Sequence, residues 1–143
     1  MDSLKHHNIN INPNYILYGD FMYESGYELT LRLLQDEPAV TAIFCANNMM
    51  AKGALKAISS AHMKIPDDIS LFSYGLIEPF STNEEFGISA IELPSALMGE
   101  ECGKMMVERL NNRKSKKYHV PRRITFDTHM ILKGSEIMPS QTK

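Results

Sequence analysis

Polar and aromatic side chains follow short apolar runs at three points in the chain, Asp20-Phe21, Asn47-Asn48 and Tyr74-Gly75. A carboxylate accepts hydrogen bonds, and an amide side chain both donates and accepts them. An aromatic ring beside such groups can stack on a flat or sugar-like molecule, so this combination suits a small polar ligand. The residues that we expect to contact the ligand are Asp20, Phe21, Asn47, Asn48 and Tyr74.

The same residues also have structural interpretations. Asn47 or Asn48 could cap the helix that follows, a role that contributes about 1 kcal/mol. Because only one of two adjacent residues can be the cap, the other remains available to a ligand. Asp20 could cap a turn, and Phe21 could lie in the core. Spacing alone supports the two kinds of role equally.

Apolar runs alternate with amphipathic stretches along the chain. The runs expected to form buried strands are 15–20, 41–46, 69–73 and 88–93, with one bent or two short strands at 122–135. The stretches with helical spacing are 23–36, 48–62 and 94–111, with a helix remnant at 1–5. Apolar strands separated by helices predict an α/β fold with a mostly parallel sheet and flanking helices. In such a sheet ligands bind at the carboxyl ends of the strands, where the three polar points lie.

The common catalytic patterns do not occur in the sequence. It contains no Gly-x-Ser-x-Gly elbow and no glycine-rich phosphate loop. Its five histidines do not pair with Cys, Asp or Glu at zinc-ligand spacing. Acidic pairs such as Glu100-Glu101 are sequence neighbours, whose side chains point apart on a helix or strand. We therefore expect neither an enzyme nor a metal or other cofactor.

The bulk composition favours one soluble globular domain. The chain has 143 residues, a formal net charge of −2 and two cysteines. The net charge gives no electrostatic footprint for nucleic acid, and the two cysteines do not make a disulfide framework. Both cysteines lie in apolar patterns and are expected in the core. The helical stripe expected to pack inward contains Leu97, Met98, Cys102, Met105, Met106 and Leu110. The sequence has no recognisable signal peptide or membrane-spanning run, so we expect a cytoplasmic protein without a membrane partner.

Five segments occur in a characteristic order, "GDFMYESGYE", "TAIFCANNMMAKGALKAI", "KIPDDISLFSY", "LPSALMGEECGKMMVERL" and "RRITFDTHMILKGS". Together they resemble the C-terminal part of the effector-binding domain of the LacI/GalR family of transcriptional regulators, over about residues 15–135. The resemblance implies a periplasmic-binding-protein type I-like fold, in which two α/β lobes close over a small molecule at their hinge. In that family the sensor dimerises and follows a DNA-binding helix-turn-helix, and the ligand biases the DNA-binding heads.

The resemblance also implies roles for individual residues. Phe21 matches the family's stacking aromatic, and Asn47 matches its ligand-contacting asparagine, while the aspartate that follows in the family is Asn48 here. An aspartate that accepts hydrogen bonds from sugars and purines falls on Gly75, which has no side chain. Ser95 stands where some members place an aromatic ligand contact. We therefore expect simple sugars to bind weakly, and the effector, with a sugar or sugar derivative among the candidates, is left open.

The resemblance further implies a partial chain. The expected organisation is a linker or helix remnant at 1–14, a partial effector-binding domain at 15–135 and a tail at 136–143. No helix-turn-helix precedes Met1 in this sequence, so we expect DNA binding only through a domain that is missing here. Exposed faces of a partial lobe favour a homodimer, with or without domain swapping. The alternative is a fragment of an extracytoplasmic type I solute-binding protein for sugars, which a signal peptide in the upstream coding sequence would favour.

Overall fold

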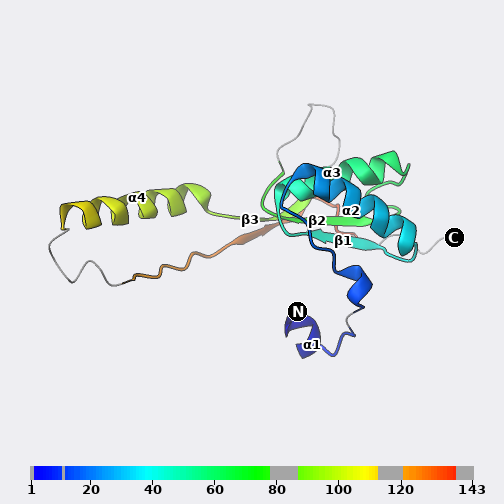
Figure 1. The fold of residues 1–143 in the computed structure, drawn as a ribbon, viewed down its shortest axis with the longest axis horizontal. Helices are drawn as coiled ribbons and strands as arrows, with labels where there is room; N and C mark the ends of the chain where they lie inside the picture. Colours follow the sequence, from blue (N-terminus) through cyan, green and yellow to red (C-terminus); the bar gives the residue numbers. More distant parts are fainter. Residues whose placement is uncertain (1, 11, 78–86, 113–120, 138–143) are drawn as a thin grey trace. The chain divides into compact units, whose positions relative to one another are not determined.

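The computed structural model describes residues 2–10, 12–77, 87–112 and 121–137. Its elements are α1 (Asp2–His6), the 3-10 helix η1 (Pro13–Tyr15), α2 (Tyr23–Asp36), β1 (Ala42–Cys45), α3 (Asn48–Ser60), β2 (Ser70–Tyr74), β3 (Ser89–Glu92), α4 (Ser95–Asn111) and β4 (His129–Ile131) (Figure 1). The chain divides into two compact units. Residues up to Ile91 and from Met130 onward form the first, and Glu92–His129 form the second.

The sheet has the strand order β1-β2-β3-β4. β1 pairs with β2 and β2 pairs with β3, and both pairs are parallel. Within the first unit, α3 packs against β1, β2 and α2. The buried apolar cluster between these elements contains Cys45, Ala51, Ala54, Ile58, Ile69, Leu71, Ile77 and Ile88. These observations confirm the predicted α/β class with a mostly parallel sheet and flanking helices.

Two glycines allow α2 and α3 to approach closely. A Cβ atom on Gly53 would overlap the carbonyl oxygen of Tyr23, and a Cβ atom on Gly26 would overlap that of Met50. Both glycines are buried. Because only glycine leaves room for this backbone contact, the pair fixes how α2 lies on α3, and therefore where the turns that precede both helices are held.

The segment after β4 holds the amino ends of β2 and β3 together. Ser135 is 1% exposed, and its hydroxyl donates to the carbonyl oxygen of Leu71 (2.6 Å) and accepts from the backbone N–H of Ser89 (2.8 Å). The Ser89 hydroxyl in turn donates to the carboxylate of Glu136. This bond, together with the backbone N–H of Gly134, keeps the pKa of Glu136 below its ordinary value of 4.5.

Two predicted strands differ from the structure. Residues 15–20 were expected as a buried strand, but Tyr15 ends the 3-10 helix η1 and residues 16–20 run outside the sheet. An apolar run becomes a strand only where a neighbouring strand offers backbone partners, and this segment is not paired with β1. The closing segment 122–135 contains a single three-residue strand, β4, among the described residues.

The second unit contains α4, whose predicted inward stripe is wrong. None of the seventeen residues of α4 is buried. Cys102, expected in the core, is exposed, whereas Cys45 is buried as expected. An apolar stripe becomes core only when another layer covers it, and the described part of this unit supplies no such layer. Polar contacts at its surface include the ion pairs Lys104–Glu100 (2.8 Å) and Arg122–Glu108 (2.6 Å).

Parts of the sequence interpretation lie outside the described residues. Most of the tail expected at 136–143 falls there. The boundaries proposed at 14/15 and 135/136 remain predictions. In the part of the chain that is described, no helix has the length and apolar character needed to cross a membrane.

Candidate functional site

Asn47 joins the turn before α2 to the carboxyl end of β1 at one edge of the first unit. Its side-chain Nδ2 donates to the carbonyl oxygen of Phe21 (2.8 Å), and its Oδ1 accepts from the backbone N–H of Met50 (2.8 Å). Asn47 is therefore the N-cap of α3. The same amide ties the turn before α2 to the carboxyl end of β1, so Phe21 and Asn47 lie at the same edge. The cap uses one lone pair of Oδ1 and the bond to Phe21 uses one proton of Nδ2, which leaves one of each.

Asn48 links the same edge to the carboxyl end of β2. It is the first residue of α3, and its half-buried side chain donates from Nδ2 to the carbonyl oxygen of Leu76 (3.2 Å). A Cβ atom on Gly75 would lie 3.7 Å from the Cβ of Asn48, which is ordinary contact. The three polar points of the sequence, at residues 20–21, 47–48 and 74–75, are thus brought together by two asparagine side chains.

Phe21 has an exposed ring and an unfavourable backbone. Its side chain is 60% exposed, so the interpretation of Phe21 as a core residue is wrong. Its φ is +68°, a conformation that costs a residue with a Cβ atom roughly 1–2 kcal/mol. A large apolar ring held in this way contributes little burial to the fold. Strained residues of this kind are concentrated at binding sites.

Asp20 caps the turn that leads into α2. Its Oδ1 accepts from the backbone N–H of Met22 (3.0 Å), and its own N–H donates to the Ser25 hydroxyl oxygen (3.3 Å). The Ser25 side chain, followed by the backbone N–H of Met22, lowers the pKa of Asp20, which therefore stays ionised at neutral pH. The structural role of Asp20 is present in the structure, and its role toward a ligand remains a prediction.

Tyr74 ends β2 with its side chain 41% exposed. Gly75 follows with a φ of +95°, donates its N–H to the carbonyl oxygen of Ile91 (2.9 Å), and accepts from the Ser73 hydroxyl (2.8 Å). This conformation favours glycine, which gives a local reason for the residue at that position. The chain therefore turns sharply at the carboxyl end of β2.

Ser95 belongs to the second unit and begins α4. It is exposed, and its backbone N–H and hydroxyl both donate to the carbonyl oxygen of Leu93, at 2.7 and 3.4 Å. Its predicted contact with a ligand remains a prediction. Within the described ranges, His, Cys, Asp and Glu side chains form no group of three that could hold a metal ion.

A family model described as a periplasmic binding protein-like domain matches residues 2–130. The chain belongs to this family. CelR of Thermobifida fusca, an HTH-type transcriptional regulator, is 28% identical over 120 residues, which are 84% of this chain and 34% of CelR. The HTH-type transcriptional repressor PurR of Klebsiella pneumoniae is 31% identical over 117 residues, or 80% of this chain and 33% of PurR. The chain thus spans about a third of the length of these curated relatives.

Solved structures give the same assignment. The complex of the transcriptional regulator CelR with cellobiose has a TM-score of 0.78 at 26% identity, covering 94% of this chain and 39% of that one. A LacI family regulator from Enterococcus faecium with bound ribose has a TM-score of 0.78 at 21% identity, covering 94% and 48%. The first supports the kinship with LacI-family regulators, and the second shows the fold alone. The relatives of this periplasmic-binding-protein-like chain are regulators of transcription rather than enzymes.

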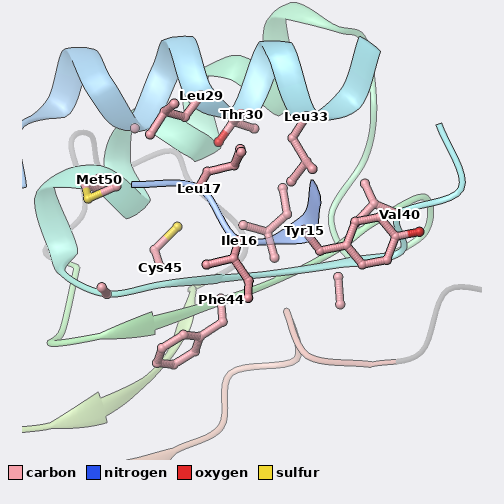
Figure 2. A pocket seen from close by; sticks show the side chains of 14 residues that line it. Tyr15, Ile16, Leu17, Leu29, Thr30, Leu33, Val40, Phe44, Cys45 and Met50 are labelled. Atoms are coloured by element: carbon pink, nitrogen blue, oxygen red, sulfur yellow. The ribbon is translucent and has the colours of Figure 1, made fainter. Parts of the chain in front are cut away.

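This periplasmic-binding-protein-like chain also contains a cavity that the sequence interpretation missed. It has a volume of about 360 Å³ and lies between α2, the segment before it and β1 (Figure 2). Its lining residues are Tyr15, Ile16, Leu17, Gly26, Leu29, Thr30, Leu33, Val40, Ala42, Ile43, Phe44, Cys45, Ala46 and Met50. The signal that could have revealed it is the apolar run at 15–20, which reads as a strand although the structure gives it no strand partner.

Proposed function

We propose that the chain is part of the effector-sensing domain of a LacI/GalR-type transcriptional regulator, with residues 15–135 forming that partial sensor. The family match over residues 2–130 and the regulators among its relatives support this proposal. Because the chain spans about a third of those relatives, operator binding is assigned to a helix-turn-helix outside these 143 residues. A role as a solute-binding protein fragment has no specific support from these relatives.

The observation that carries the ligand-binding part is the pairing of Phe21 with Asn47. Phe21 presents an exposed ring from a strained backbone, and the Asn47 amide fixes the carbonyl oxygen of Phe21 at 2.8 Å. An exposed ring whose backbone is held by an amide is suited to stacking on a ligand whose polar groups meet the remaining donor and acceptor of Asn47. The carboxyl edge of a parallel sheet is also the usual location of such a site.

The effector that this edge suits is a small polar molecule with a flat or ring-shaped face. Cellobiose is bound by the CelR neighbour and ribose by the Enterococcus faecium neighbour. Gly75 offers no side-chain acceptor beside Asn48, so we expect both sugars to bind this chain only weakly. A side chain at position 75 would meet Asn48 only at ordinary contact distance, but the φ of +95° strains any residue other than glycine there.

We further propose that the chain forms a homodimer and acts in the cytoplasm, where a regulator of transcription would meet its operator. The exposed apolar side chains of α4 support self-association. They are Leu97, Met98, Met106, Val107 and Leu110, each more than 40% exposed. Apolar surface gathered on one helix is a usual sign of a protein–protein contact.

Calorimetric titration tests the ligand site. The chain is titrated with cellobiose, ribose and a panel of other sugars and nucleobases, and the best compound is repeated with Phe21→Ala. We expect that variant to lose at least tenfold in affinity, about 1.4 kcal/mol, because the stacking ring is gone. Tyr18→Ala is the matched control, since Tyr18 is 87% exposed and is not a proposed contact. Micromolar affinity for a simple sugar would refute the role given to Gly75, and equal loss in both variants would refute the role of Phe21.

A further inference from the structure

Cys102, Met105 and Met106 form a group of three sulfur side chains within α4. Residues three and four apart on an α-helix are neighbours, with Cβ atoms about 5–6 Å apart, so both methionines lie beside Cys102. Long side chains on a helix lean toward its N-terminus, and Met105 and Met106 therefore extend back over the turn that carries Cys102. The three sulfur atoms can approach one point above Cys102.

Solvent reaches this group of sulfur side chains. Cys102 is a free, exposed cysteine, Met106 is 64% exposed, and Met105 is half-buried. A Cβ atom on Gly99, one turn before Cys102, or on Gly103, next to it, would meet nothing within 4 Å. The usual role of methionine as a filler of a core does not apply to α4, which has no buried residue. Space beside the three sulfur atoms is therefore open to an ion.

The ligand types on this part of α4 favour a soft metal ion. The nearby carboxylates are held in ion pairs, Glu101 with Lys104 (2.7 Å) and Glu108 with Arg122 (2.6 Å). Calcium and magnesium need several oxygen ligands, and zinc is usually held by four nitrogen, oxygen or thiolate ligands. No group of three His, Cys, Asp or Glu side chains that could supply them occurs in the described ranges. Thiolate and thioether sulfur are soft ligands that select Cu(I).

We propose that Cys102, Met105 and Met106 bind one Cu(I) ion, through the Sγ atom of the cysteine and the Sδ atoms of the two methionines. On binding, the Cys102 thiol releases its proton to solvent, and the thiolate balances the charge of the ion. The copper enters and remains as Cu(I), so no electron is transferred. The inference goes beyond the proposed function and holds whether or not the carboxyl edge binds an effector.

The two thioethers distinguish this group from an isolated thiol. A single cysteine offers a metal ion one ligand, whereas the methionines at i+3 and i+4 fill the remaining positions of a three-coordinate ion. Cys45 is the contrasting case in the same chain, because it is buried and burial raises the pKa of its thiol to about 12. Since the thiolate is the metal ligand, Cys45 is not available to Cu(I) at neutral pH while the chain is folded.

Anaerobic titration of the reduced 143-residue chain with Cu(I), in competition with a coloured Cu(I) chelator, tests the proposal. We expect one ion per chain and no binding in Cys102→Ser. The double variant Met105→Leu/Met106→Leu should lose at least tenfold in affinity, about 1.4 kcal/mol, because leucine keeps the apolar volume but offers no sulfur. Met130→Leu is the matched control, since Met130 is 65% exposed and lies in β4, and its affinity should be unchanged.

X-ray absorption at the copper edge supplies a second readout on the natural chain, where we expect three sulfur neighbours. A double variant that binds as tightly as the natural chain would overturn the proposal in favour of an isolated thiol. One ion per two chains would overturn it in favour of a bridge between copies. Displacement of the copper by an equal concentration of Zn(II), or fewer than three sulfur neighbours, would also overturn it.

Discussion

The side-chain amide of Asn47 donates to the carbonyl oxygen of Phe21 at 2.8 Å, although the two residues are 26 positions apart. This bond connects the turn before α2 to the start of α3, and it places an exposed aromatic ring beside the end of β1. The sequence left open whether Asn47 caps a helix or contacts a ligand, and the structure shows the cap. Asn47 caps its helix through Oδ1, and the rest of its amide organises the edge at which a ligand is proposed to bind.

The contact between α2 and α3 should be highly sensitive to the size of one residue. Gly53→Ala places a methyl group against the carbonyl oxygen of Tyr23, so we expect it to lower the free energy of unfolding by about 1–3 kcal/mol or more. Gly99→Ala is the control, because a Cβ atom there meets nothing within 4 Å. That change should slightly favour α4, by up to about 1 kcal/mol. Urea unfolding followed by circular dichroism compares them, and equal effects of the two changes would contradict the close helix contact.

The C-terminal contact through Glu136 should make stability depend on acid. Since the pKa of Glu136 in the folded chain lies below its ordinary value of 4.5, the ionised carboxylate stabilises the fold above that value. The stabilisation is lost as the pH falls below 4.5 through the lowered pKa of the folded state. Glu136→Gln should therefore be less stable than the natural chain at pH 7, with the difference shrinking in acid. Glu28→Gln, at an exposed position of α2, is the control. A stability difference that does not depend on pH would count against the Ser89–Glu136 contact.

The two cysteines should react at very different rates. Burial raises the pKa of the Cys45 thiol to about 12, while Cys102 is exposed on α4. Because the thiolate is the reactive form, a disulfide reagent at neutral pH should modify Cys102 quickly and Cys45 only slowly or on unfolding. The Cys102→Ser variant should lose the fast phase alone. A fast phase that persists in this variant would mean that Cys45 is accessible.

How much of the fold the sequence predicts depends on which other elements pack against or pair with each patterned segment. Periodicity located α2, α3, β1 and β2 to within a few residues, because each packs against its neighbours within the same unit. The apolar periodicity of α4 also predicted that Cys102 lies in the core, which is wrong. An apolar stripe does not indicate whether another layer of the fold covers it. The sequence pattern also assigned a strand to residues 15–20, where an apolar run has no backbone partner.

The candidate site was predictable only in part. The carboxyl ends of parallel strands gather at one edge, so the meeting of residues 47–48 and 74–75 follows from the order of elements. Residues 20–21 follow a segment outside the sheet and are held at this edge by the Asn47 amide. Which asparagine caps α3 did not follow, because both have the right chemistry. The positive φ of Phe21 could not be foreseen either, since phenylalanine carries no preference for it.

The apolar surface of α4 should drive self-association. Met106 is 64% exposed, and Met106→Lys introduces a charge into that surface, so we expect it to shift the chain from dimer toward monomer. Asn111→Lys adds the same charge at an exposed polar position of the same helix and should have little effect. Multi-angle light scattering over a range of concentrations measures both. A natural chain that remains monomeric at high concentration would contradict the proposed homodimer.

We propose that Phe21 is kept in a strained conformation because its ring contacts the effector. Phe21→Gly should raise the free energy of unfolding by about 0.5–1 kcal/mol, since relief of roughly 1–2 kcal/mol of strain exceeds the added chain entropy of glycine. The most direct measurement is the thermal stability of this variant, with and without the best ligand from the calorimetric panel, beside the natural chain. We expect a more stable variant that the ligand no longer stabilises further. A variant that the ligand stabilises as much as the natural chain would contradict it.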